Sequence, residues 1–265
     1  MTRHEWRRVL NGKQKFKEGM RMDRGRKRWG RAVSLVAVGV ITLLFLLFCG
    51  VLHINNPDSA KYPIVGVDVS SYQGTINWET LAAQDIRFAF IKATEGSSLI
   101  DACFEKNWAD ASKTDLRIGA YHFFSFESPG ETQADLFCGV VTPVGHMLPP
   151  VIDVEYYGKY KSEKDNRVSD VKAQLRILVD RMTAAYGMKP IIYASKDTYE
   201  SIINEDFGDC DLWMRSVYSE VKNDIDWTFW QYSDRHVLRG YSGKERFIDM
   251  NVFCGGADAF ASYPK

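Results

Sequence analysis

The stretch Val151-Ile152-Asp153-Val154-Glu155 places two acids, two residues apart, in a short apolar run. Val and Ile favour strands, and residues i and i+2 of a strand point to the same face, about 6.5–7 Å apart along the chain. Acids inside an apolar strand cost free energy unless they are paired or functional. The stretch therefore predicts a buried strand that carries two acids on one face toward its carboxyl end.

Seven further stretches of this kind lie on either side of it, and polar or turn-forming residues separate them. They are rich in the β-branched and aromatic residues that favour strands. Their bounds are Ile64–Ser70, Phe88–Lys92, Ile118–Phe124, Pro190–Ala194, Leu212–Val217, Trp227–Tyr232 and Phe247–Phe253. Together with Val151–Glu155 they predict eight short strands.

The gaps after the first five strands leave room for helices. In the clearest of these, Val168–Tyr186, apolar residues recur at helical spacing and Gly187 provides a stop. The other helices are expected at Trp78–Gln84, Ala102–Thr114, Gly130–Val140 and Asp197–Ile203. The last two gaps, about ten and fifteen residues long, are short for a crossover helix, so the last strands are expected to be antiparallel. This order predicts an α/β fold, an irregular TIM-like (β/α)5(β)3 barrel.

Acids gather at the strand ends where α/β barrels carry their active sites. Asp68 and Asp249 lie in the first and last strands and join Asp153 and Glu155. Several acids at one barrel mouth suit general acid–base catalysis, because burial and mutual repulsion raise the pKa of one of them. The alternative is that they form ion pairs that hold the barrel together. Four acids at one mouth favour the catalytic interpretation.

Aromatic residues crowd the same strand ends and include Tyr121, Phe123, Tyr193 and Trp230. Flat rings beside acids suit stacking on a substrate ring. The alternation of a strand nevertheless turns about half of such residues toward the helices. The aromatic residues therefore give only weak support for a binding groove.

His122 raises the alternative of a metal site. With Asp153 and Glu155 it would supply a ligand set of the histidine and carboxylate kind. A hydrogen-bonded barrel histidine is the favoured interpretation. We therefore expect no metal and no other cofactor.

The chain is neutral overall, but its charge is divided along its length. Residues 1–31 hold twelve Lys and Arg and three Asp and Glu, a net charge of +9, so the remainder carries −9. Residues 32–52 contain no charged side chain, which is the length and composition of a membrane-spanning helix. They predict a basic cytoplasmic arm at 1–31, a signal anchor at 32–52, a linker at 53–62 and a catalytic domain at 63–265 outside the cytoplasm.

Two alternatives were weighed for this N-terminal part. A cleaved signal peptide is disfavoured, because the apolar run is long and its exit lacks a small-residue cleavage site. Binding of the basic arm to nucleic acid is disfavoured, because an arm beside a membrane span sets topology and meets anionic lipid. We expect no nucleic acid partner and a monomer.

Four cysteines of the outer domain leave two interpretations open. Cys103, Cys138, Cys210 and Cys254 would form two disulfides in one of three pairings, or would remain buried thiols. Their wide spacing excludes a zinc ribbon and a C-x-x-C redox site.

Seven blocks in order resemble the glycoside hydrolase family 25 lysozymes, the N-acetylmuramidases, over residues 62–260. They are Gly66–Gly74, Phe90–Gly96, Gly119–Phe123, Asp153–Glu155, Ile192–Ser195, Trp230–Ser233 and Asp249–Asn251. The resemblance implies a barrel of five strand–helix units and three further strands. It also implies cleavage of the β-1,4 bond from N-acetylmuramic acid to N-acetylglucosamine in peptidoglycan.

The resemblance also implies roles for single residues. Glu155 matches the general acid and Asp153 its partner carboxylate, while Asp68 and Asp249 match flanking acids that position Glu155 and substrate. Tyr121, Phe123 and Tyr193 match aromatic residues that line the substrate groove. The spacing of Asp153 and Glu155 suits either a retaining or an inverting mechanism. Arg215 departs from the small residue found in many relatives, which puts one sugar subsite in doubt.

These patterns together predict a membrane-anchored peptidoglycan hydrolase for cell-wall remodelling. It would be a single-pass protein of the inner or plasma membrane, with its catalytic domain in the periplasm or at the cell surface. The alternative is a non-catalytic glycan-binding module on a membrane stalk. The presence of all four acids speaks against that alternative, since a pure binder needs no paired acid.

Overall fold

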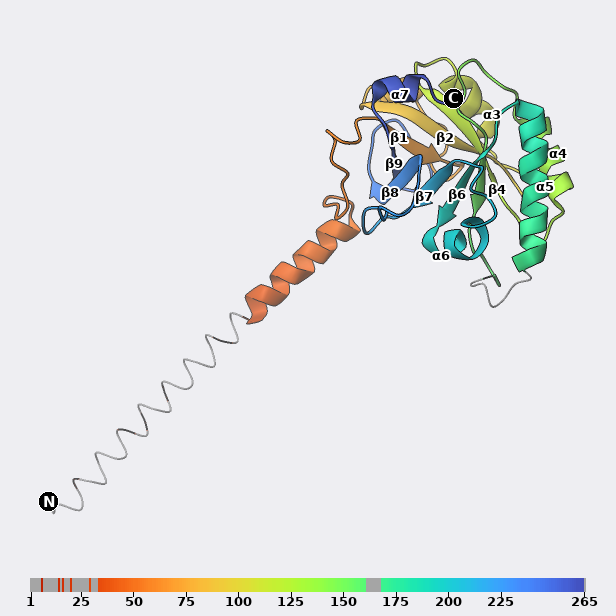
Figure 1. Cartoon of the computed structure of the whole chain (residues 1–265). Helices are drawn as coiled ribbons and strands as arrows, with labels where there is room; N and C mark the ends of the chain where they lie inside the picture. Colours follow the sequence, from red (N-terminus) through yellow and green to blue (C-terminus); the bar gives the residue numbers. More distant parts are fainter. Residues whose placement is uncertain are drawn as a thin grey trace. The chain divides into compact units, whose positions relative to one another are not determined.

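The computed structural model describes residues 33–160 and 168–264, together with isolated positions 6, 14, 16, 20 and 29 (Figure 1). Most of the predicted basic arm, residues 1–31, lies outside the described residues. The chain forms two compact units, Met1–Leu52 and His53–Lys265. Each unit is considered by itself.

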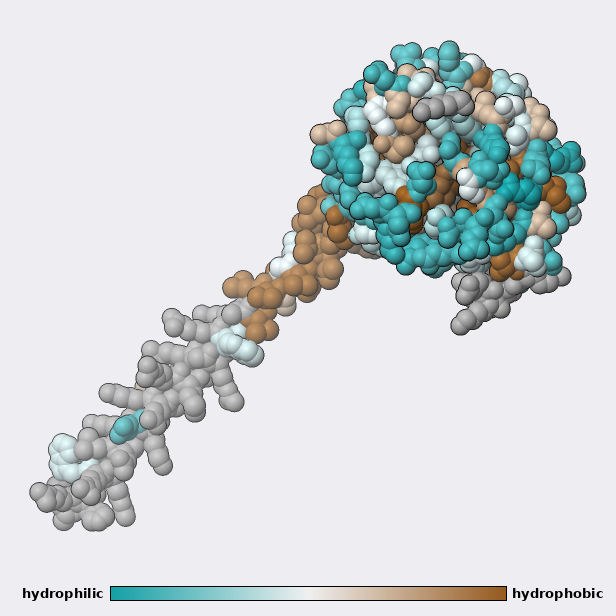
Figure 2. All heavy atoms as spheres, in the orientation of Figure 1, coloured by the Kyte–Doolittle hydropathy of each residue, from teal (hydrophilic) through white to brown (hydrophobic). Residues whose placement is uncertain are grey.

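Residues 33–48 of the first unit are helical, within the predicted membrane anchor. Figure 2 shows apolar side chains along this helix, and Leu35 and Val36 are among the exposed ones. The helix ends before the predicted boundary at Leu52, because Gly50 adopts a left-handed φ of 66° and the Val51 N–H bonds back to the Leu46 carbonyl. None of the helices among the described residues is long and apolar enough to cross a membrane. The predicted transmembrane helix is therefore not supported by this part of the chain.

The second unit is built on a closed sheet. Its strands are β1 (Val65–Val69), β2 (Ile86–Glu95), β3 (Leu99–Ile100), β4 (Arg117–Phe123), β5 (Val151–Val154), β6 (Ile191–Ser195), β7 (Leu212–Arg215), β8 (Phe229–His236) and β9 (Ile248–Phe253). The order is β1-β9-β8-β7-β6-β5-β4-β2-β3, and pairing of β1 with β2 closes the barrel. The short β3 lies outside the closed ring, where it pairs only with β2. The predicted eight-stranded α/β barrel is thereby confirmed.

Helices cover the barrel in the predicted gaps (Figure 1). They are α2 (Trp78–Ala82), α3 (Phe104–Ala111), α4 (Gly130–Val140), α5 (Val168–Tyr186) and α6 (Lys196–Thr198) with the π-helical turn η2 (Tyr199–Ile203). A further short helix, α7 (Ala257–Ala261), follows β9 and was not predicted. α4 and α5 lie side by side against the sheet. The chain leaves α5 through Gly187, whose φ is 70°, at the stop that the sequence predicts.

The prediction of three antiparallel final strands is wrong for one pair. β7 and β8 are parallel, whereas β9 is antiparallel to both β8 and β1. Residues 216–228 connect β7 to β8 without a helix. Since β7 is short and a parallel crossover needs about a dozen residues, an irregular segment of this length is sufficient.

Alternation along the strands divides the core into two parts. Phe88, Phe90, Trp213 and Phe229 belong to a cluster inside the barrel, while the residues between them pack toward the helices. Gly66 makes room for this inner cluster, because a Cβ atom there would come within 2.4 Å of the Phe88 ring. Aromatic side chains thus fill the lower barrel, and polar inner-facing residues follow only at its mouth.

The segment before β1, predicted as a linker, packs on the barrel. The Asn55 amide donates hydrogen bonds to the carbonyl oxygens of Ser216 and Ser219, at 2.8 and 3.0 Å. Tyr62 is buried, and its ring centroid lies 5.4 Å from that of Trp227.

The cysteines Cys103, Cys138, Cys210 and Cys254 are free thiols in the structure, so it contains none of the three pairings left open by the sequence.

Candidate active site

The alternation that buries the aromatic cluster also places polar side chains at the barrel mouth. In β5, Val151 faces inward, so Asp153 and then Glu155 follow on the same face. In β7, Arg215 follows Trp213, and in β8, Gln231 follows Phe229 in the same way. The strands thereby bring the four predicted acids together with residues that the sequence interpretation had left out.

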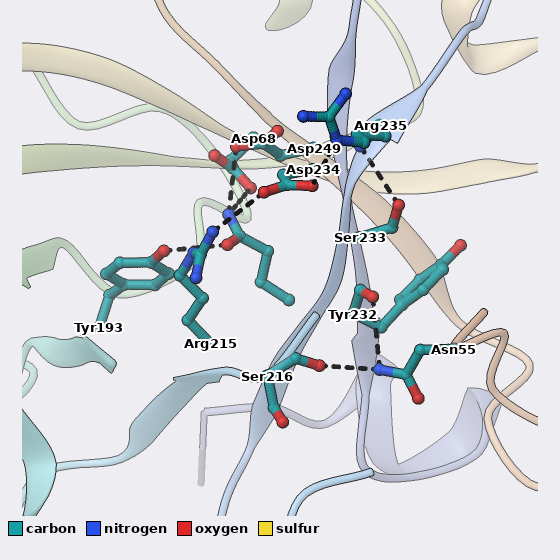
Figure 3. A network of polar contacts seen from close by, with 11 residues as sticks. Asn55, Asp68, Tyr193, Arg215, Ser216, Tyr232, Ser233, Asp234, Arg235 and Asp249 are labelled. Atoms are coloured by element: carbon teal, nitrogen blue, oxygen red, sulfur yellow. Dashed lines mark hydrogen bonds and ion pairs between the residues drawn. The ribbon is translucent and has the colours of Figure 1, made fainter. Parts of the chain in front are cut away.

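Asp68 and Asp249 form the first pair of acids. They stand directly opposite each other in the antiparallel pairing of β1 and β9. Asp68 Oδ2 accepts a hydrogen bond from Gln231 Nε2 at 2.9 Å (Figure 3). It accepts a second one from Asn251 Nδ2 at 2.8 Å. Burial raises the pKa of Asp68. The two donors favour the charged form of Asp68 and therefore offset part of this rise.

Asp249 is the second member of this pair. Burial raises its pKa well above the ordinary range, and the neighbouring charge of Asp68 raises it further. Gln231 Nε2 also lies 3.3 Å from Asp249 Oδ2. Burial raises the pKa of both carboxyls, so the pair resists carrying two negative charges at once.

Asp153 and Glu155 form the second pair. Asp153 is 8% exposed, and its Oδ1 is buried with no hydrogen-bond partner among the described residues. Burial raises the pKa of Asp153 well above its usual range, and the charge of Glu155 adds to this effect. A buried carboxyl oxygen without a donor is unfavourable in the folded state, which is typical of a group kept for its chemistry.

Glu155 follows directly after β5 and is half-buried. Burial raises its pKa, and the charge of Asp68 adds to this, whereas the Arg215 charge and a hydrogen bond from Tyr193 lower it. A raised pKa keeps the carboxylic acid protonated to higher pH than an exposed glutamate. Glu155 is therefore suited to donate a proton near neutral pH.

Two buried amides connect these acids to the rest of the mouth. The Tyr193 hydroxyl donates to Gln231 Oε1 at 2.9 Å, and Gln231 donates onward to Asp68. Trp213 Nε1 donates to Asn251 Oδ1 at 2.8 Å. The sequence interpretation missed both amides as site residues. The available signal was an amide side chain within an apolar strand, which needs a buried partner.

The structure separates the four predicted aromatic site residues. Tyr121 and Phe123 lie half-buried on the inner face of β4, and Tyr193 reaches the acids through its hydroxyl. Trp230 is fully buried on the helix-facing side of β8, where its Nε1 donates to the Ser216 carbonyl at 2.9 Å. Its neighbours Phe229 and Gln231 face inward, so alternation turns Trp230 away from the acids.

His122 also faces away from Asp153 and Glu155. Its Nδ1 lies 2.7 Å from Thr94 Oγ1 and its Nε2 lies 3.0 Å from Gln133 Oε1. Burial lowers the pKa of His122 to about 4, so the ring is neutral. His122 is the hydrogen-bonded barrel histidine of the favoured interpretation. No cluster of metal-ligating side chains occurs within the described ranges.

Comparison with known proteins places this arrangement in context. The family model for glycosyl hydrolases family 25 matches residues 67–241. The chain is 36% identical over 212 residues to the protein YegX of Escherichia coli K12, which covers 77% of this chain and 74% of YegX. It is 30% identical over 205 residues to lysozyme M1 of Streptomyces globisporus, with coverage of 73% and 69%. The solved structure of a family 25 glycosyl hydrolase from Bacillus anthracis is similar with a TM-score of 0.73 and 46% identity, covering 80% of this chain and 98% of that one.

Proposed function

The chain belongs to glycosyl hydrolases family 25 and is a glycoside hydrolase, and we propose that it is a muramidase acting on peptidoglycan. The bond cleaved is the β-1,4 linkage from N-acetylmuramic acid to N-acetylglucosamine. The names of similar proteins, lysozyme M1 of Streptomyces globisporus and an N,O-diacetylmuramidase of Arthroderma benhamiae, support this assignment.

One observation carries the proposal: Asp153 and Glu155 share the inner face at the carboxyl end of β5, beside the Asp68–Asp249 pair. Glu155 donates its proton to the glycosidic oxygen as the bond breaks. Asp153 stabilises the positive charge that develops on the sugar or on its assisting N-acetyl group. Asp68 and Asp249, held by Gln231, keep Glu155 and the substrate in place.

The aromatic side of the mouth suits a glycan strand. The Phe123 ring lies 5.5 Å from that of Tyr157, and Phe126 packs against Tyr157 at 5.4 Å. The Tyr157 hydroxyl accepts a hydrogen bond from the Phe126 backbone N–H at 2.8 Å, which fixes the ring. Rigid rings beside acids provide apolar surface for sugar faces at small entropic cost.

The test is digestion of purified peptidoglycan by the full-length protein. Reducing-sugar release and mass spectrometry of the products should show fragments with N-acetylmuramic acid at the reducing end. Fragments with reducing-end N-acetylglucosamine would contradict the proposed bond. Glycan binding without any product would favour the binding-module alternative.

The cellular location is a further part of the proposal. We propose that residues 32–52 attach the protein to the plasma or inner membrane, with residues 1–31 in the cytoplasm and the catalytic domain on the other side. The uncharged run from Ala32 to Leu52 and the +9 charge before it support this orientation.

Protease treatment of intact spheroplasts tests this orientation. The C-terminal domain should be degraded in intact cells, and an N-terminal epitope should be degraded only after lysis. Protection of the domain in intact cells, or its recovery in the soluble fraction, would refute the assignment.

A further inference from the structure

An ion pair between Arg215 and Asp234 lies at the barrel mouth beside the acids (Figure 3). Arg215 Nη2 lies 3.0 Å from Asp234 Oδ2, and the two side chains are 33% and 35% exposed. Such partial burial leaves each charge only partly screened by solvent. The pair places a cation next to Gln231, its neighbour in the β7–β8 register, which donates to Asp68 and lies 3.3 Å from Asp249.

The strand register explains why Arg215 takes this position. Arg215 pairs with Ser195 of β6 and with Gln231 of β8, so it stands between the strands that carry Tyr193 and the bridging amide. The β8–β9 register shifts between Gln231 and Ser233, and Asp234 follows this irregularity. Bulges of this kind re-aim side chains near active sites, and here Asp234 reaches Arg215.

The two members of the ion pair act in opposite directions on the neighbouring acids. The Arg215 charge lowers the pKa of Glu155 and that of Asp249. The Asp234 charge raises the pKa of Asp249. Asp234 therefore offsets part of the effect of Arg215.

We propose that Arg215 and Asp234 are positioning residues whose ion pair sets the upper pH limit at which Glu155 acts as a proton donor. The inference rests on the proposed role of Glu155 as the general acid. Arg215 alone would favour loss of the Glu155 proton at lower pH. Asp234 reduces this effect, because its carboxylate holds the Arg215 guanidinium and partly neutralises its charge.

Other charged and titratable groups share the mouth and are left unchanged in the test. They are Asp68 of β1, Lys92 and Glu95 of β2, Tyr121 of β4, Asp153 of β5, Tyr193 of β6, Asp249 of β9, and Arg235 of β8, whose Nε lies 4.0 Å from Asp234 Oδ1.

The test compares the Arg215→Met and Asp234→Asn variants of the full-length protein with wild type. kcat/KM on peptidoglycan is measured across pH, and the Glu155 carboxyl is titrated by 13C NMR without substrate. Arg215→Met should move the alkaline limb of the rate profile and the Glu155 titration upward by about half a pH unit or more. Asp234→Asn should move the alkaline limb and the Glu155 titration to lower pH.

The matched control is Arg87→Met, which breaks an exposed ion pair with Asp85 at the start of β2. It should change neither the alkaline limb nor the Glu155 titration.

Opposite shifts in the two variants support the inference. Unchanged midpoints, or shifts of both variants in the same direction, overturn it. If wild type hydrolyses no glycan, the proposed function fails, and the NMR titration still decides whether the ion pair controls Glu155. If one variant fails to fold, the direction observed for the other decides.

Discussion

Replacement of Glu155 by Gln should lower kcat on peptidoglycan by about 10²–10⁴-fold, the usual contribution of a general acid. Gln has nearly the same shape as Glu but no acidic proton to transfer to the leaving oxygen. Burial raises the pKa of Glu155, so in wild type the carboxyl keeps its proton to higher pH than an exposed glutamate does. Because the proton is transferred only as the bond breaks, KM should change much less than kcat.

Reducing-sugar release, measured over a range of substrate concentrations, separates kcat from KM. The matched control is Glu105→Gln, the same substitution on the exposed surface of α3, which should keep wild-type rates. A folded Glu155→Gln protein that retains more than a tenth of the wild-type kcat would show that another group supplies the proton.

The sequence predicted the four acids because their residue type conflicts with their surroundings. Asp153 lies among Val and Ile residues, and no apolar strand needs a carboxyl group for its own stability. The two-residue period then placed Asp153 and Glu155 on one face without any knowledge of the neighbouring strands. The barrel followed from the order of strands and helices, which is a local property of the chain.

Features that depend on pairing between distant strands were not predicted. The parallel direction of β8 depends on the path of residues 216–228, which have no regular pattern. The inward positions of Gln231 and Asn251 depend on which residue of β8 or β9 faces the barrel axis. Trp230 illustrates the same point, since its aromatic character suits either face and only the phase of the alternation decides.

The N-terminal segment shows a different limit. The absence of charge over residues 32–52 is a compositional signal, and a helix does form at 33–48. The end of that helix was set by the backbone of Gly50, which hydropathy does not report. Composition thus predicts an environment better than it predicts an element boundary.

The Asp153→Asn variant should be more stable than wild type at neutral pH and at the same time nearly inactive. Asp153 is buried, its Oδ1 has no hydrogen-bond partner in the described part of the chain, and burial raises the pKa of this carboxyl well above its ordinary value of 3.8. The charged form of Asp153 therefore costs free energy in the folded state. The contribution of Asp153 to the stability of the folded state is complete below pH 3.8 and falls as the pH rises through the higher folded-state pKa. Asn resembles the protonated carboxyl and avoids this loss.

The gain comes from removing the cost of ionising a buried carboxyl, which is about 1.4 kcal/mol for each pH unit by which burial raises the pKa of Asp153, up to the pH of the measurement. For a domain of this size that corresponds to a rise in Tm of about 2–4 °C per kcal/mol. The Asp153→Asn variant should be more stable than wild type at pH 7. This difference should vanish near pH 3, where the wild-type Asp153 carboxyl is also uncharged. The activity should fall by about 10²–10³-fold, because the amide carries no negative charge to stabilise the developing positive charge.

Thermal unfolding at pH 7 and pH 3, combined with kcat at pH 7, measures both effects. Asp110→Asn is the control of opposite sign. Its ion pairs with Lys106 and Lys113 hold the pKa of Asp110 at about 2, so this carboxylate stabilises the fold above pH 3.8 and its loss brings no gain at pH 7. An Asp153→Asn protein that is less stable than wild type at pH 7 would show that Asp153 serves packing. A gain in stability together with loss of rate would show that the fold tolerates this unfavourable carboxylate because catalysis requires its charge.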